Sequence, residues 1–189
     1  MPDTNALPEL HTERLTLRRL TLDDARDVQR LAGNPDVALM TTNIPYPYED
    51  GMAEAWIATH RDAFARDEAV VLAITLRSDG TLVGGVGLTL DEDEPSAELG
   101  YWVGKPYWNK GYCTEAARAV LQYGFERWPL ERIHACHLAR NTASGRVMQK
   151  LGMTYHSRLP KRAGRQREME DLIRYQILRT DFQPDSSPT

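Results

Sequence analysis

The sequence predicts one α/β domain of the α+β kind, in which a mixed sheet carries helices on its faces. Three observations predict it. Strand-like and helix-like segments follow one another in the order β-α-α-β-β-β-α-β-α-β-β. Asp79-Gly80, the strongest short hairpin signal, stands between two β-rich runs within residues 69–91. A helical segment separates the strand-like residues 97–104 and 131–141, and such a crossover makes its two strands parallel.

The first half of the chain supplies an opening strand, two helices and the hairpin. Residues 13–20, ERLTLRRL, alternate leucine imperfectly with polar residues, as an opening strand does. The segment 21–33 has two aspartates in its first turn and a glycine at its end, which predicts a helix. After the proline-rich loop 43–50, apolar residues at helical spacing predict a second helix over 52–66. The hairpin leads into the acidic turn 91–96.

The second half of the chain centres on a long helix predicted from about Thr114 to Trp128. Its apolar side chains at spacing i, i+4 and i+8 share one face, and a proline stops it at position 129. A short helix over 143–152, closed by a glycine, follows the strand 131–141. Two last strands, 153–160 and 169–182, flank a basic loop. The predicted domain spans 8–182, with flexible tails over 1–7 and 183–189.

Composition limits the possible functions. The 189 residues are 41% hydrophobic and 26% charged with a net charge of −4, which argues against DNA binding, since that requires a basic stripe. The basic run 158–167 is predicted to be a solvated loop rather than a site for an anionic partner. No apolar run approaches membrane length, and the first residues lack the pattern of a secretory signal. The two cysteines form neither a disulfide framework nor a metal motif, so a cytoplasmic protein without a metal is expected.

One stretch, WNKGYCTEAARAV (Trp108–Val120), has the composition of an anion site. A helix N-terminus presents unpaired amides, Gly111 admits a ligand close to the backbone, and Lys110 and Thr114 add a charge and a hydroxyl. The alternative is a glycine needed only for the turn. A nucleoside-triphosphate loop is excluded because no G-x-x-x-x-G-K-[ST] occurs, and the glycines of GGVGLTL lead into a strand, which excludes the dinucleotide fingerprint.

Segments along nearly the whole chain resemble a known family. ELGYWVGKPYWNKGYCTEAARAVLQYGF and NTASGRVMQKLGM resemble the GCN5-related N-acetyltransferase superfamily, and more closely its ribosomal-protein N-terminal acetyltransferase branch. LHTERLTLRRLTLDDA, PYPYED and DLIRYQILRTDF support the resemblance. It implies a mostly antiparallel sheet with a central, splayed pair of parallel strands. It also implies acetyl-CoA as the co-substrate and a primary amine as the acceptor.

The resemblance assigns the cofactor contacts. The family's pyrophosphate motif, Q/R-x-x-G-x-G/A, falls on Trp108, Gly111 and Cys113, so two of its positions depart from the pattern. Cys113 at a helix N-terminus also suggests a nucleophile, but direct transfer in the family favours a small residue that donates its amide. The implied pyrophosphate contacts are the backbone amides of Asn109, Lys110, Gly111, Tyr112, Cys113 and Thr114. The pantetheine arm would pair with the strand backbone at Tyr101, Trp102 and Val103, which could equally be an ordinary buried strand.

The second motif, N-x-x-S, gives Asn141 and Ser144. From the residues alone, either is a helix cap. The resemblance places Asn141 beside the pantetheine and the Ser144 hydroxyl near the thioester sulfur, where it would protonate or hydrogen-bond the departing thiolate. Arg146 and Lys150 share a helix face, and either meet the 3′-phosphate of the cofactor or are solvated.

The general base is sought on the neighbouring strands. Glu98 alternates with Gly100 and Trp102 on one strand face, where a raised pKa would suit a base. Glu98 could instead bind a cationic acceptor or be an exposed strand residue. His134 and His137 are weaker candidates and are expected on opposite faces of their strand.

The acceptor side is the least constrained by the sequence. Tyr46, Tyr48 and Trp56 are predicted to line an amine or peptide pocket, or else to be core and loop packing. The acceptor is expected to be a protein N-terminus or a small amine such as a polyamine, amino acid or antibiotic, and a homodimer is left open. A non-catalytic acyl-CoA sensor is the alternative of another class.

Overall fold

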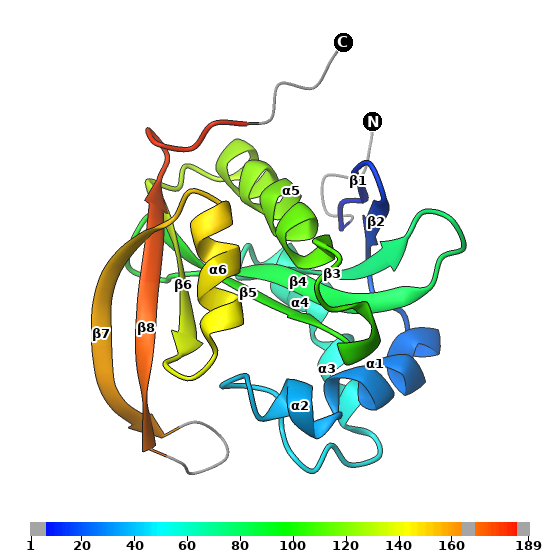
Figure 1. Cartoon of the computed structure of the whole chain (residues 1–189). Coiled ribbons are helices and arrows are strands. Elements are labelled where there is room, and N and C mark those ends of the chain that lie inside the picture. Colours follow the sequence, from blue (N-terminus) through cyan, green and yellow to red (C-terminus); the bar gives the residue numbers. More distant parts are fainter. Residues whose placement is uncertain (1–6, 164–168, 185–189) are drawn as a thin grey trace, which may run out of the picture.

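The computed structural model describes residues 7–163 and 169–184, which form one eight-stranded mixed sheet. The strand order is β1-β2-β3-β4-β5-β6-β8-β7 (Figure 1). The strands are β1 (Leu10–His11), β2 (Leu15–Arg18), β3 (Ala69–Leu76), β4 (Leu82–Leu90), β5 (Ser96–Val103), β6 (Arg132–Leu138), β7 (Thr154–Ala163) and β8 (Met169–Leu178).

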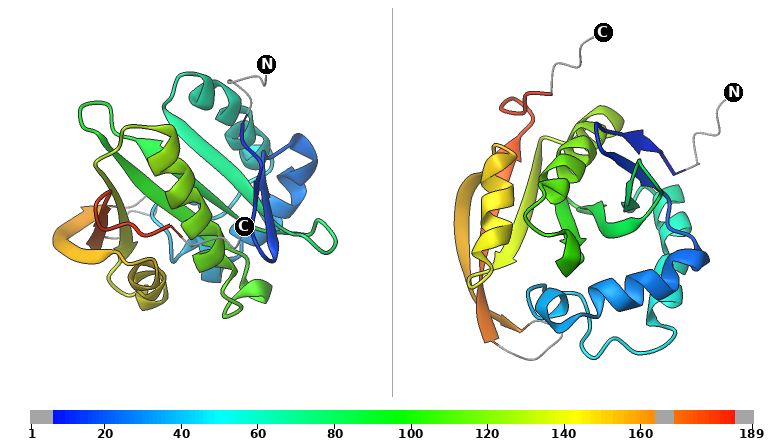
Figure 2. Two further views of the ribbon diagram at one scale, coloured as in Figure 1. Left: turned by 90° about the horizontal axis from the view of Figure 1, so that it is seen from above. Right: turned by 45° about the vertical axis from the view of Figure 1, so that its right-hand side comes forward.

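Helices cover both faces of this sheet. α5 and α6 lie on one face of the sheet, and α1 and α3 lie on the other, as all three views in Figures 1 and 2 show. The helices are α1 (Ala25–Ala32), α2 (Pro35–Ala38), α3 (Met52–Ala58), α4 (His60–Ala65), α5 (Tyr112–Arg127) and α6 (Thr142–Lys150). The mixed α/β fold with helices on its faces is therefore confirmed.

The alternation of side chains along β3 shows how the two faces are built. Val70, Leu72 and Ile74 belong to the main core under α5, whereas Val71 and Ala73 pack against the second core under α1 and α3. A period of two sends successive side chains to opposite faces of a strand. Because both faces are covered, the strand is apolar almost throughout, in place of a polar and apolar alternation.

The sheet opens at its centre. β5 and β6 are parallel, as predicted, but they pair only over Ser96–Glu98 and Arg132–His134. Beyond this register β5 pairs with β4 alone, and β6 pairs with β8 alone. The two backbones therefore diverge in the middle of the sheet, next to α5 and α6.

Several element boundaries differ from the predictions. The predicted helix 52–66 is divided into α3 and α4 at Thr59, whose Oγ1 donates a hydrogen bond to the Trp56 carbonyl (2.8 Å). α5 begins at Tyr112 instead of Thr114, because the left-handed Gly111 serves as its N-cap (φ 81°). The short α2 was not predicted, although Pro35 stands at its first position and the Asn34 side chain caps it.

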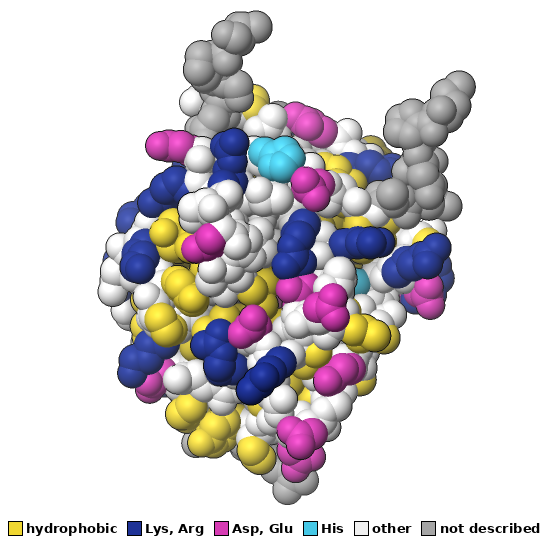
Figure 3. Space-filling model, turned by 90° about the vertical axis from the view of Figure 1, so that its right-hand side faces the viewer, with side chains coloured by type: hydrophobic (Ala, Val, Ile, Leu, Met, Phe, Trp, Pro, Cys, Tyr) yellow, Lys and Arg dark blue, Asp and Glu magenta, His cyan; other side chains and the backbone are white. Residues whose placement is uncertain are grey.

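The predicted basic loop and tails fall partly on residues 1–6, 164–168 and 185–189, outside the described residues. Residues 158–163 of the predicted basic loop belong to β7 instead, and there Arg158 forms an ion pair with Asp171 (2.5 Å). Leu7 and Phe182, next to the predicted tails, pack against the main core. On the face drawn in Figure 3, basic, acidic and hydrophobic side chains are interspersed. Among the described helices, none combines the length and the apolar character needed to cross a membrane.

Candidate functional site

The turn between β5 and α5 has the backbone conformation of an anion-binding helix start. Asn109 and Gly111 both have left-handed backbones, with φ of 61° and 81°. The first backbone bond of α5 runs from the Glu115 N–H to the Gly111 carbonyl at 3.1 Å. The amides of Tyr112, Cys113 and Thr114 precede that bond, so they have no carbonyl partner within the helix. Unpaired amides of this kind can receive an anion, and the contact of this turn with a pyrophosphate stays a prediction.

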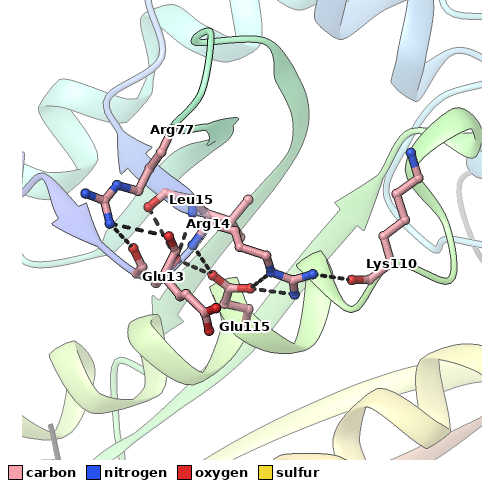
Figure 4. A network of polar contacts seen from close by, with 7 residues as sticks. Glu13, Arg14, Leu15, Arg77, Lys110 and Glu115 are labelled. Atoms are coloured by element: carbon pink, nitrogen blue, oxygen red, sulfur yellow. Dashed lines mark hydrogen bonds and ion pairs between the residues drawn. The ribbon is translucent and has the colours of Figure 1, made fainter. Parts of the chain in front are cut away.

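Two basic side chains flank this turn. Lys110 is exposed, and its Nζ lies 5.7 Å from the centre of the Tyr107 ring. Arg14, from the turn between β1 and β2, donates from Nη1 to the Lys110 carbonyl (2.8 Å) and pairs with Glu115 (2.6 Å; Figure 4). The sequence analysis did not find Arg14, since nothing local connects it to residues so distant in the chain.

Cys113 is suited to packing rather than to nucleophilic chemistry. Its side chain packs against the main core, and burial raises the pKa of the thiol to about 12. A protonated thiol is a weak nucleophile. The interpretation of Cys113 as a small residue is therefore favoured over the nucleophile.

The three residues predicted to contact the pantetheine lie on β5 beyond the point where it leaves β6. The Tyr101 side chain lies on the α6 side, with its hydroxyl 3.0 Å from Ser144 Oγ and 3.1 Å from the Ser144 carbonyl. Trp102 lies on the opposite face and packs against the second core. Val103 is buried, and its carbonyl accepts a hydrogen bond from the Trp108 indole (2.6 Å). Trp108 thus fixes the start of the turn instead of supplying the motif's polar group.

Asn141 and Ser144 have different roles at the start of α6. Asn141 Oδ1 accepts from the Ser144 backbone N–H (3.1 Å), which makes Asn141 the N-cap, and its Nδ2 donates to the Met40 carbonyl (2.9 Å). Ser144 is not the cap, and its hydroxyl contacts the Tyr101 hydroxyl. The cap alternative therefore holds for Asn141, and the Ser144 hydroxyl is available for chemistry.

The sequence analysis gave Tyr101 only a backbone contact and overlooked its side chain, which pairs with the Ser144 hydroxyl. Burial and the nearby Cys113 raise the pKa of its phenol, and the hydrogen bond with Ser144 lowers it by less. The phenol is therefore protonated at neutral pH. The signal was present in the alternation of β5, where Ala97, Leu99 and Val103 share with Tyr101 the face that packs in the main core.

Glu98 lies on the other face of β5, between Thr89 of β4 and His134 of β6 in register. Its side chain is exposed at the sheet surface, yet partial burial raises the pKa of the carboxyl, with Asp91 raising it further and Arg174 lowering it. The raised pKa agrees with the prediction for a base. Arg174 was missed by the sequence analysis, and its buried Nε has no hydrogen-bond partner among the described residues.

The two histidines of β6 lie on opposite faces, as predicted. His134 is buried 3.8 Å from Asp91, and desolvation together with Arg174 lowers its pKa. His137 lies against α6, and its Nδ1 is 2.8 Å from the Leu138 carbonyl. It lines a shallow cavity of about 220 Å³ with Thr142, Gly145, Arg146, Gln149 and Tyr175. Arg146 and Lys150 are both exposed, and their contact with a 3′-phosphate stays a prediction.

The three predicted acceptor residues do not form one cluster. Tyr48 and Trp56 pack against the second core together with Trp102, and the Trp56 ring meets the His60 ring edge-on at 4.5 Å. Tyr46 is exposed in the loop before them. Packing therefore accounts for Tyr48 and Trp56, and their contact with an acceptor stays a prediction.

Comparisons of the sequence with known proteins identify its family. A family model described as acetyltransferase (GNAT) domain matches residues 14–154. The uncharacterized N-acetyltransferase YnaD of Bacillus subtilis is 31% identical over 172 residues, covering 90% of this chain and 97% of YnaD.

Two solved structures share the fold. A candidate ribosomal-protein-serine acetyltransferase of Vibrio cholerae superposes with a TM-score of 0.74 at 26% identity, covering 90% of this chain and 97% of that one. The ribosomal L7/L12 α-N-protein acetyltransferase RimL, in complex with coenzyme A, superposes with a TM-score of 0.79 at 14% identity, covering 90% and 98%. At that identity the second likeness concerns the fold alone.

Proposed function

This chain belongs to the acetyltransferase (GNAT) family, and we propose that it transfers an acetyl group from acetyl-CoA to a primary amine by direct attack within a ternary complex. The observation that carries the proposal is the opening between β5 and β6, with the free amides of α5 at one end and the Tyr101–Ser144 hydroxyl pair beside it. Such an opening fits a long ligand with an anionic end.

The residues present would fit two parts of coenzyme A, its pyrophosphate and its pantetheine arm. The first-turn amides of α5 and the charge of Lys110 would hold the pyrophosphate. The β5 backbone from Tyr101 to Val103 has no β6 partner, so the groups that β4 and the Trp108 indole leave unpaired would hydrogen-bond the amides of the pantetheine arm by strand addition. Acetyl-CoA, when bound, supplies the acyl group as an activated thioester.

The residues at the inner end of the opening would assist the exchange of bonds at the acyl carbon. Backbone amides near Val103 would polarise the acyl carbonyl as the amine nitrogen bonds to its carbon and the carbon–sulfur bond breaks. The Ser144 hydroxyl would give its proton to the leaving sulfur, the Tyr101 phenol 3.0 Å away would restore it, and solvent water would return a proton to the phenol after the products leave. Both hydroxyls are protonated at neutral pH and so can donate.

Glu98 would take the proton that the amine must lose. An alkyl amine is mostly protonated near neutral pH, so attack requires a proton acceptor, direct or through a water molecule. A carboxyl whose pKa is raised by its surroundings accepts that proton more readily than an ordinary one. The same carboxylate would attract a cationic amine to this face of the sheet.

We propose a protein N-terminal α-amine as the acceptor. The support is the description of the V. cholerae structure as a candidate ribosomal-protein-serine acetyltransferase, at 26% identity over most of both chains. Small amines are the competing acceptors, and the acceptor screen below distinguishes the two.

The test combines binding with an acceptor screen. Calorimetry should detect binding of acetyl-CoA and no binding of ATP. Mass spectrometry of reactions with peptide and small-amine panels should find acetylated N-termini. ATP binding without acetyl-CoA binding would contradict the proposal. Acetyl-CoA binding without turnover on any panel would indicate an acyl-CoA sensor. Thiol-release dyes are unsuitable, because the Cys136 thiol, which is in no disulfide, would react with them.

A further inference from the structure

Arg14 connects the turn between β1 and β2 to the start of α5, where Figure 4 shows its contacts with Lys110 and Glu115. Its guanidinium bonds to the Lys110 carbonyl and to Glu115, and lies 4.9 Å from the centre of the Tyr112 ring. A Cβ at Gly111 would lie 3.2 Å from Arg14 Nη2, so the guanidinium packs directly against that glycine.

The bond to Lys110 fixes the direction of one amide of the turn. Lys110 stands between two left-handed residues, Asn109 and Gly111, and its carbonyl oxygen is 2.8 Å from Arg14 Nη1. In a trans peptide, the carbonyl of one residue and the N–H of the next point in opposite directions. The Gly111 N–H therefore points away from Arg14 and joins the free amides of the first turn of α5.

Glu115 holds Arg14 in this position. Its carboxylate accepts from Arg14 Nε (2.7 Å), from the Arg14 backbone N–H (2.9 Å) and from Thr12 Oγ1 (2.6 Å). Burial opposes the ionisation of Glu115, but these hydrogen bonds together lower the pKa of the carboxyl. The charge of Glu115 is also paired with that of Arg14, so a carboxylate in the first turn of α5 does not repel an anion.

We infer that Arg14 is a positioning residue for donor binding, which aims the Gly111 amide at the pyrophosphate while Glu115 holds it in place. The inference rests on the proposed function for the identity of the donor. Asn109 and Gly111 are residue types that adopt left-handed backbones readily, and Arg14 supplies a contact from outside the turn that holds the Lys110–Gly111 peptide in one orientation.

The test compares two acyl donors that differ in the pyrophosphate. Acetyl-CoA carries it, whereas S-acetylpantetheine has the same thioester and arm without it. Arg14→Ala should raise the KM for acetyl-CoA about tenfold, as expected for the loss of about one hydrogen bond to a charged group. Its KM for S-acetylpantetheine and its kcat should stay within about twofold of the unmodified protein.

Two further variants separate positioning from folding. Arg14→Lys keeps the charge but cannot bond Glu115 and the Lys110 carbonyl at once, so it should give an intermediate KM for acetyl-CoA. Arg66→Ala, which removes an exposed arginine paired with Glu68 at 2.5 Å, is the matched control and should leave both KM values unchanged. Each variant's melting temperature is measured alongside.

A spectroscopic readout does not depend on turnover. In ¹H–¹⁵N spectra, coenzyme A should shift the Gly111 amide resonance in the unmodified protein and less so in Arg14→Ala. Equal losses for both donors, or an unchanged KM for acetyl-CoA, would overturn the inference with the proposed function intact. If the unmodified protein bound no acetyl-CoA, the proposed function itself would fail.

Discussion

The Tyr101 hydroxyl lies 3.0 Å from Ser144 Oγ, and this contact joins β5 to the start of α6 where the central strands separate. The Ser144 carbonyl also accepts from the phenol (3.1 Å), so the two side chains hold each other in one arrangement. In a hydroxyl pair of this kind, one hydroxyl can give its proton to a leaving group and then receive a proton from the other.

Ser144→Ala should lower kcat by about 100-fold with little change in the affinity for acetyl-CoA, because general acid catalysis contributes that much. Tyr101→Phe should lower kcat as well, and the double variant should be no slower than the slower single variant, since the two groups act as a unit. Steady-state kinetics and calorimetry on the three variants measure this. Additive losses would show that the hydroxyls act separately, and an unchanged kcat for Ser144→Ala would remove it from the mechanism.

Gly111→Glu should abolish acetyl-CoA binding, because it places a carboxylate at the turn that receives the pyrophosphate. Gly111→Ala should destabilise the protein by about 1–2 kcal/mol, the cost of a side chain in the left-handed region. Gly80 is the matched control, since it has a φ of 75° with nothing within 4 Å of its added Cβ.

Gly80→Ala and Gly80→Glu should lose similar stability and keep their affinity for acetyl-CoA. Thermal denaturation and calorimetry on the four variants separate the backbone cost from the loss of binding. If the glutamate variants at both positions bound the donor equally well, the pyrophosphate would have to lie elsewhere.

Cys113→Ala should keep kcat/KM within about twofold of the unmodified protein, because a half-buried thiol whose pKa is raised to about 12 is not the acyl carrier. At pH 7 about one such thiol in 10⁵ is ionised. In a Cys136→Ser background, iodoacetamide should therefore label Cys113 slowly at neutral pH. Accumulation of an acetylated Cys113 during turnover would instead establish a covalent intermediate.

Local patterns predicted most of the fold. Side-chain periodicity and the Asp79-Gly80 signal located the strands other than the two-residue β1, and the crossover between 97–104 and 131–141 predicted the parallel pair. The division at Thr59 escaped prediction, because the apolar spacing of 52–66 continues across it and only a side-chain bond to Trp56 marks the break.

Local conformation around the candidate site was predictable where it depends on neighbours in sequence, as in the glycine turn before α5 and the Asn141 cap of α6. Contacts between distant segments were not. Arg14 reaches Glu115 over a separation of 101 residues, and Arg174 comes beside Glu98 only through the order of β5, β6 and β8. Strand order is a property of the whole sheet, and periodicity within a segment does not contain it.

The pH dependence of kcat/KM should report the ionisation of Glu98. The carboxylate is the active form, so the rate should fall as pH falls through its pKa, which lies above the ordinary value for a glutamate. Glu98→Gln should lower kcat by about 100-fold if the residue is the base. If Glu98 only attracts a cationic acceptor, the same variant should raise the acceptor's KM and leave kcat near that of the unmodified protein.

Two charge-removing variants should shift, in opposite directions, the pH at which kcat/KM falls on the acidic side of its profile (the acidic limb). Arg174 lowers the pKa of Glu98, so Arg174→Gln should move the limb to higher pH, whereas Asp91 raises it, so Asp91→Asn should move the limb to lower pH. His134, which faces Glu98 from β6, has a pKa lowered by desolvation and by Arg174, so it becomes charged at a lower pH than an ordinary histidine. The ionisation of the acceptor is the same in all variants, so a difference between them in the position of the acidic limb reports a group on the enzyme. An acidic limb that stays fixed in both variants would place the titrating base elsewhere.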